Sequence, residues 1–208
     1  GLLLSILFAT NTACAIELDS NDTYALDCNN IAKQVKFIRP EAKEFDGYFD
    51  LWVGHYHIKI PPNYIRIDLN VNGELTVEYP NKASLSLNTT FLRKREKYQI
   101  YENIDVTQFP KIAYLKTNCD KWPVSEAEKK LWKLGLSRKK YIFEYPEDTI
   151  VTKSGRLTYY LANYSKTRRV ATASIVDEKY DYTYLKMDSH NIAHEDFKKI
   201  VLNVKLWE

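Results

Sequence analysis

The sequence predicts an α+β protein, built mainly of antiparallel β-sheet with a few helices packed against it. Three observations lead to this fold class. Apolar and polar residues alternate over many short segments, tight-turn residues separate neighbouring segments, and only a few stretches have the spacing of an amphipathic helix. The composition agrees with this, because tyrosine, which favours strands, occurs sixteen times.

The first predicted elements are a helix and a long strand. Residues 25–37 carry apolar side chains at helical spacing, and the helix should end before Pro40. Residues 51–60 alternate regularly and predict one strand. His55 and His57 then project from the same face of that strand.

A β-hairpin is expected next. Asn72 and Gly73 form a dipeptide typical of two-residue hairpin turns. Residues 75–79 form the returning strand and end before Pro80. The strand that precedes the turn, residues 64–71, places four apolar side chains on one face: Ile65, Ile67, Leu69 and Val71.

The middle of the chain mixes both kinds of element. Residues 93–97 are a basic cluster that fits either a helix or a charged hairpin. Residues 112–116 predict a short strand that leads into Cys119.

A capping box marks the start of the next helix. Ser125 is followed three residues later by Glu128, and the helix should bury Trp132 and end at Gly135. Residues 141–145 predict the strand after it.

The C-terminal third has the clearest pattern. Residues 157–164, 170–176 and 180–187 predict a meander of three antiparallel strands. A helix should follow from Ser189 or His194, and residues 204–207 form a final short strand. The helix is indicated by apolar residues at helical spacing: Phe197, Ile200, Val201 and Val204.

The N-terminal segment indicates export. Residues 1–15 are uncharged and consist of an apolar run followed by Ala13-Cys14-Ala15, the pattern of a signal sequence and its cleavage site. We therefore expect a signal remnant at residues 1–15 and a single α+β domain at residues 16–208, in the periplasm or otherwise exported. The alternative is a buried N-terminal strand or helix.

Export would determine which of the three cysteines remain and whether they form a disulfide. Cys14 either leaves with the signal or is kept and lipidated, which would attach the protein peripherally to a membrane. Cys28 and Cys119 remain, and two cysteines in an oxidising compartment suggest one disulfide.

Composition and motifs argue against several function classes. The charge is balanced, with 30 basic and 27 acidic residues, so nothing indicates a nucleic-acid partner. The chain has only six glycines and no glycine-rich phosphate loop, and we expect no cofactor. No G-x-S-x-G nucleophile motif is present, so no catalytic residue is predicted.

Histidines and acidic residues leave two further alternatives open. His55 and His57 would hold zinc if a third ligand converged on them, and His190 and His194 are spaced to share one helix face. Neither pair belongs to a zinc signature, so we expect no metal site and keep a metal-dependent hydrolase as an alternative. Acidic groups at residues 46–50 and 177–181 are more typical of turns than of glycosidase carboxylate pairs.

The C-terminal strands also predict a binding surface. Tyrosine offers a large contact area with a polar tip, and it is common in protein interfaces. The candidate surface places alternate tyrosines on one face, with more tyrosines nearby and two arginines at the rim: Tyr180, Tyr182, Tyr184, Tyr160, Tyr164, Arg168 and Arg169.

Two stretches resemble a known family. The segment Val53-Gly54-His55-Tyr56-His57-Ile58-Lys59-Ile60-Pro61 resembles the opening strand of the exported lipoprotein immunity proteins that neutralise phospholipase effectors of type VI secretion. The segment Phe197-Lys198-Lys199-Ile200-Val201-Leu202-Asn203-Val204-Lys205-Leu206 resembles the closing helix and strand of that group, and also the end of PsbP-like sandwiches. The resemblance implies a protein that binds and inhibits a toxin in the periplasm, with no catalytic residues to carry over.

These observations favour a periplasmic immunity or inhibitor protein that has no turnover of its own and binds a toxin effector through a protein–protein interface. The alternative is an exported module that binds a small molecule or a lipid in a pocket between sheet and helix.

Overall fold

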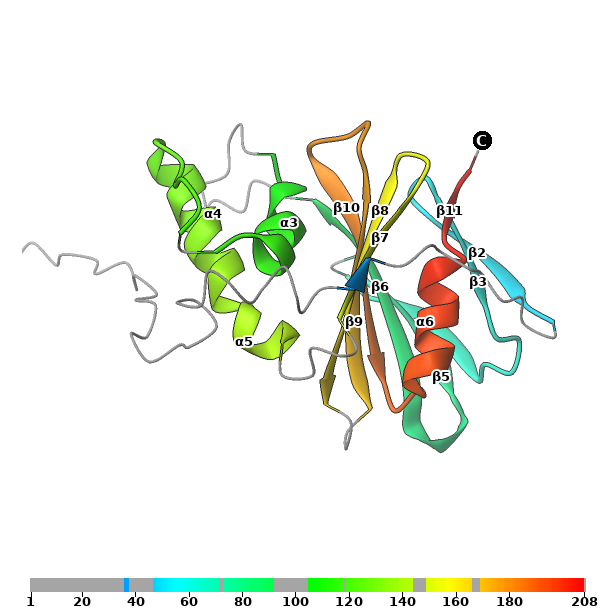
Figure 1. Ribbon diagram of the computed structural model, residues 1–208. Helices are drawn as coiled ribbons and strands as arrows, with labels where there is room; N and C mark the ends of the chain where they lie inside the picture. The colour runs from blue at the N-terminus through cyan, green and yellow to red at the C-terminus, as the bar shows by residue number, and fades with distance from the viewer. Residues whose placement is uncertain are drawn as a thin grey trace, which may run out of the picture.

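The protein has the predicted α+β fold, mainly antiparallel β-sheet with helices packed against it (Figure 1). A computed structural model describes residues 36–37, 47–71, 73–91, 105–117, 119–143, 149–165 and 169–207. Within these ranges, no helix combines the length and the apolar character that a membrane span requires.

The main sheet has eight strands, and all of its neighbours are antiparallel except the pair at one edge, which is parallel. The predicted hairpin and the predicted meander both belong to it. From one edge to the other its strands are β1 (Lys36–Phe37), β7 (Ile150–Ser154), β8 (Leu157–Ser165), β9 (Val170–Asp177), β10 (Thr183–His190), β6 (Ala83–Phe91), β5 (Leu75–Tyr79) and β4 (Arg66–Leu69). A short 3-10 turn, Pro80–Lys82, joins β5 to β6.

A second layer covers one face of the main sheet. It consists of helix α6 (His194–Leu202) and a small antiparallel sheet with the order β11 (Lys205–Leu206), β3 (Tyr56–Ile60), β2 (Phe49–Val53). Both lie on the same side of the main sheet in Figure 1. The larger core fills the space between the layers, and its fully buried members include Tyr56, Ile58, Leu87, Leu161, Ile175, Met187, Phe197 and Ile200.

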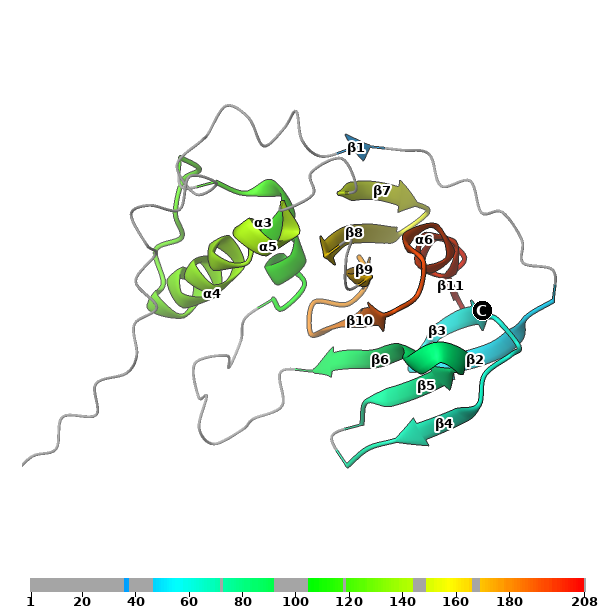
Figure 2. The ribbon, with the colours of Figure 1, turned by 90° about the horizontal axis from the view of Figure 1, so that it is seen from below.

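Helices cover the opposite face at one end of the sheet: α3 (Gln108–Leu115), α4 (Glu126–Ser137) and α5 (Lys139–Ile142) (Figure 2). Strand β8 serves both cores because successive side chains point to opposite faces. Tyr159 and Leu161 belong to the core under α6, whereas Tyr160 and Ala162 belong to the core under α3 and α5.

The predicted strand at residues 51–60 is in fact a hairpin. Its turn contains Gly54, which has φ +62°, a value that favours glycine. The turn separates β2 from β3 and pairs Trp52 with His57. The alternating pattern is therefore shared by two short strands instead of one long strand.

Residues 112–116 do not form the predicted strand, since residues 112–115 belong to helix α3. Asp105 stabilises the start of this helix by accepting hydrogen bonds from the backbone N–H of Thr107, at 2.9 Å, and from the Gln108 side chain, at 2.7 Å. In a similar way, α5 occupies the first part of the strand expected at residues 141–145.

The N-terminal helix prediction is wrong at its end, because Lys36 and Phe37 form β1. The rest of that segment, the signal remnant and the basic cluster at residues 93–97 lie outside the described residues.

Cys119 is disulfide-bonded. Its predicted partner Cys28 and the leader cysteine Cys14 are outside the described residues, so the Cys28–Cys119 pairing stays a prediction.

Candidate functional site

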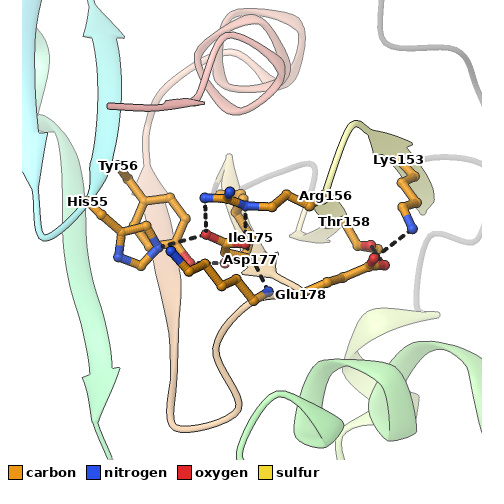
Figure 3. A network of polar contacts seen from close by, with 9 residues as sticks. His55, Tyr56, Lys153, Arg156, Thr158, Ile175, Asp177 and Glu178 are labelled. Atoms are coloured by element: carbon orange, nitrogen blue, oxygen red, sulfur yellow. Dashed lines mark hydrogen bonds and ion pairs between the residues drawn. The ribbon is translucent and has the colours of Figure 1, made fainter. Parts of the chain in front are cut away.

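An ion pair between a buried aspartate and an exposed arginine connects the loops at one end of the main sheet. Asp177, the last residue of β9, has a fully buried side chain, and Arg156 in the β7–β8 turn donates two hydrogen bonds to it (Figure 3). The Nε–Oδ1 distance is 2.9 Å and the Nη2–Oδ2 distance is 3.1 Å. This bidentate geometry fixes the direction of both side chains.

Further polar contacts hold the same two loops together. The backbone N–H of Lys179 donates to Asp177 at 3.0 Å. Beside it, Glu178 accepts a hydrogen bond from Lys153 at 2.7 Å and a longer one from Thr158 at 3.4 Å. The loops therefore form a preorganised platform instead of two independent turns.

His55 connects the small sheet to this platform. It lies in the β2–β3 turn with Nε2 at 3.4 Å from Asp177 Oδ2 (Figure 3). Burial lowers the pKa of His55 below its ordinary value of 6.5; Asp177 opposes this effect, whereas Arg156 and Lys179 add to it. Burial thus favours the neutral imidazole.

Two buried tyrosines attach the small sheet firmly to the main sheet. Tyr56 donates to the carbonyl oxygen of Ile175 at 3.2 Å, and Tyr159 donates to that of Val204 at 2.8 Å. Burial raises the pKa of Tyr56 and also that of Tyr159, the latter to about 12, so both hydroxyls stay protonated donors.

Aromatic side chains from the small sheet and the β9–β10 loop lie over this framework in two groups, which together we call the aromatic ridge. The Trp52 ring stacks on His57 with centroids 5.3 Å apart, His55 contacts Tyr180 at 4.8 Å, and Tyr180 contacts Tyr182 at 5.5 Å. The backbone N–H of Trp207 donates to the carbonyl oxygen of His55 at 2.9 Å, which joins the two groups. The ridge thus comprises Trp52, His57, Trp207, His55, Tyr180 and Tyr182.

Three aromatic side chains of the ridge are largely exposed to solvent. The side chains of Trp52, Trp207 and Tyr182 are 55%, 70% and 53% exposed. Lys205 lies directly opposite His57 in the small sheet, and the Lys179 ammonium lies 5.4 Å from the centre of the Tyr180 ring. Basic groups therefore flank the aromatic surface.

The predicted tyrosine surface is only partly reproduced. Tyr180 and Tyr182 lie in the ridge, whereas Tyr184 and Tyr160 are each 5% exposed and belong to the core under α3 and α5. Strand β10 begins only at Thr183, so Tyr180 and Tyr182 precede the strand and do not share the face of Tyr184. Tyr184 and Tyr160 are therefore wrong as contact residues.

The predicted rim is wrong for Arg169. Arg169 is exposed in the β8–β9 turn and precedes β9, whereas Tyr180 follows that strand, so the two lie at opposite ends of β9. Arg168 and the side chain of Tyr164 are outside the described part of the chain.

The histidine pairs do not converge. His57 bonds to Asp50, whereas His55 faces Asp177. His190 ends β10 and His194 begins α6, so these two do not share a helix face. Among the described residues, no group of three or more His, Cys, Asp or Glu side chains is placed to hold a metal ion.

Sequence reasoning missed Trp52 and Trp207. Interpreting residues 51–60 as one strand hid the outward face of the β2–β3 hairpin, on which Trp52 and His57 lie side by side. The signal that was present is Gly54, a glycine in the middle of an alternating run.

A separate cavity of about 390 Å³ lies between the β8–β9 hairpin and the start of α6. Its lining mixes polar and apolar side chains: Asn163, Arg169, His194 and Glu195 with Ala171, Ile192 and Ala193.

No protein-family model matches this sequence, and a search of the curated proteins also finds no match.

Proposed function

We propose that the protein is an exported immunity or inhibitor protein that neutralises a secreted toxin by binding it through the aromatic ridge. The observation that carries this proposal is the exposure of Trp52, Trp207 and Tyr182 around the β2–β3 turn. Tryptophan and tyrosine are the side chains that most often dominate the energy of protein–protein interfaces.

The framework beneath the ridge supports this proposal. The Asp177–Arg156 pair and the Tyr56 hydroxyl hold the three contributing loops in one arrangement. A surface that is ordered before binding loses little conformational entropy when it binds. The ridge is therefore suited to tight inhibition of a single partner.

The flanking charges indicate the chemistry of the partner. Lys205 and Lys179 are exposed beside the ridge, and Lys59 lies over the ring of Tyr48 at 3.7 Å. Complementary charge accelerates association and excludes wrong partners. Because Glu178 and Asp181 are also exposed in the β9–β10 loop, we expect the toxin to present acidic and basic residues around an apolar contact.

Protection of a host from the toxin tests the function. The product of a neighbouring toxin-like reading frame is directed to the periplasm of a bacterial host, where it should stop growth, and co-expression of this chain should restore growth. Tyr182→Ala and Trp52→Ala should lose protection.

Tyr141→Ala is the matched control, because Tyr141 is 45% exposed on α5, on the helical side of the molecule. It should protect as well as the wild type. Equal protection by all three variants would show that the ridge does not bind the toxin.

The cavity beside α6 favours a second function, the binding of a small molecule. Its volume of about 390 Å³ falls within the range of ligand sites. The polar side chains of the lining suit a small carboxylate or phosphate compound better than an acyl chain. A rise in Tm with such compounds, lost in Arg169→Ala, would support this alternative.

A further inference from the structure

Strand β4 is an open edge, and exposed apolar side chains lie on it and just beyond its two ends. It ends the main sheet, and among the described residues it pairs only with β5 (Figure 2). Ile65, Leu69 and Val71 are 66%, 72% and 98% exposed. An exposed apolar edge strand is a template for pairing with another strand.

The backbone of β4 has groups available for such pairing. The N–H of Asn70 donates to the carbonyl oxygen of Glu74 at 2.9 Å, so this residue faces β5. Hydrogen-bonding direction alternates along an antiparallel strand, which turns the backbone groups of Ile67 and Leu69 toward the open edge. Just before the strand this alternation stops, because the N–H of Ile65 donates to the carbonyl oxygen of Glu78 at 2.7 Å and so faces β5.

The sequence of β4 is complementary to itself. Arg66 and Asp68 flank Ile67 symmetrically. If a second β4 pairs antiparallel with Ile67 opposite Ile67, each Arg66 lies opposite Asp68 of the other copy. Each Ile65, whose N–H stays bonded to Glu78, then brings its side chain next to Leu69 of the other copy, which matches apolar with apolar on the other face.

We propose that two copies of this chain pair through β4, about a two-fold axis at Ile67. A two-fold interface needs one patch that complements itself, and the β4 pattern supplies both the charges and the apolar contacts. The surface shares no residue with the aromatic ridge, so the dimer would leave the toxin-binding residues available.

The existing contacts of Arg66 do not prevent this pairing. Arg66 Nε lies 2.7 Å from Asp68 Oδ2, and Arg66 Nη2 lies 2.8 Å from Glu78 Oε1, with all three side chains exposed. Exposed ion pairs contribute little to stability, so exchanging them for contacts across the interface costs the monomer little.

Charge exchange tests the proposal, with sedimentation equilibrium of the purified chain as the readout. The wild type should dimerise. Arg66→Asp places two acidic side chains opposite each other at each pair, and Asp68→Arg places two basic ones. Each single variant should weaken dimerisation by about tenfold or more, because like charges directly opposite are unfavourable.

Complementation makes the test specific to this register. An equimolar mixture of the two single variants should form a heterodimer, and the Arg66→Asp/Asp68→Arg double variant should dimerise again. Circular dichroism should show that every variant is folded. A wild type that stays monomeric up to millimolar concentration, or a dimer that these exchanges do not affect, would overturn the proposal.

Discussion

The helical side of the molecule and the aromatic ridge use the same kinds of side chain in opposite ways. Under α3 and α5, Tyr114, Tyr160 and Tyr184 are buried, and the rings of Tyr114 and Tyr160 lie 5.3 Å apart. In the ridge, Tyr182 and Trp52 are more than half exposed. Tyrosine is therefore both a core and a surface residue in this protein, and the start of β10 separates the exposed Tyr182 from the buried Tyr184.

The largest expected change in the free energy of unfolding distinguishes two tyrosines that are two positions apart. Tyr184→Ala removes a buried ring and should lower the free energy of unfolding by about 3–5 kcal/mol. Tyr182→Ala removes an exposed ring and should change it by about 0.5 kcal/mol or less. Urea unfolding measures both, and similar losses would contradict the comparison.

The next largest change in stability should come from a substitution at the close contact between α4 and α3. A Cβ added at Gly135 would lie 2.5 Å from Cγ2 of Ile112, so Gly135→Ala should destabilise the protein by about 1–3 kcal/mol. At an ordinary helix position this substitution stabilises. The effect of Gly135→Ala should shrink when it is made in an Ile112→Ala background; an unchanged effect would show that this contact is not its cause.

A buried lysine should make stability on the helical side depend on pH. Lys139 is fully buried and donates to the carbonyl oxygen of Ala113 at 3.2 Å. Burial lowers its pKa to about 7, although Asp120 acts in the opposite direction. Because the unfolded chain keeps this proton up to a pH of about 10, the Lys139 contribution to the free energy of unfolding should increase between pH 7 and pH 10.

Lys139→Met removes this contribution. The wild type should therefore gain about 1 kcal/mol per pH unit relative to the variant between pH 7 and pH 9. Urea unfolding at both pH values gives the difference, and parallel curves would show that Lys139 is charged in the folded protein.

The smallest change in the free energy of unfolding should come from removing the N-cap of α4. Ser125 accepts a hydrogen bond from the backbone N–H of Glu128 at 3.3 Å, so Ser125→Ala should cost about 1 kcal/mol. Ser125→Asp retains a capping oxygen and should restore most of the loss. If neither variant moved the Tm, the cap would be irrelevant to stability.

Local sequence patterns were sufficient to predict much of the fold. The Asn72-Gly73 turn and the alternation of the C-terminal strands predicted the β4–β5 hairpin and the β8–β9–β10 meander. Ser125 marked the start of α4 correctly. Gly135 did not end that helix, because its role is to let α3 approach closely, and Trp132 is half-buried.

The ridge could not be found from local signals. It exists because β11, at the end of the chain, pairs with β3 and places Trp207 beside His55. Pairing between two strands so distant in sequence does not change the apolar–polar alternation within either strand. It therefore cannot be predicted from that pattern. The sequence predicted an aromatic contact surface, and of its described residues only Tyr180 and Tyr182 belong to the ridge.

The dissociation constant of the complex with the toxin tests the central proposal most directly. Calorimetry should show that Tyr182→Ala raises this constant by about thirtyfold or more, as expected of an interface residue that dominates binding. Tyr141→Ala should leave it unchanged, and both variants should unfold at the same urea concentration as the wild type. Wild-type affinity in Tyr182→Ala and in Trp52→Ala would contradict the proposal that the aromatic ridge binds the toxin.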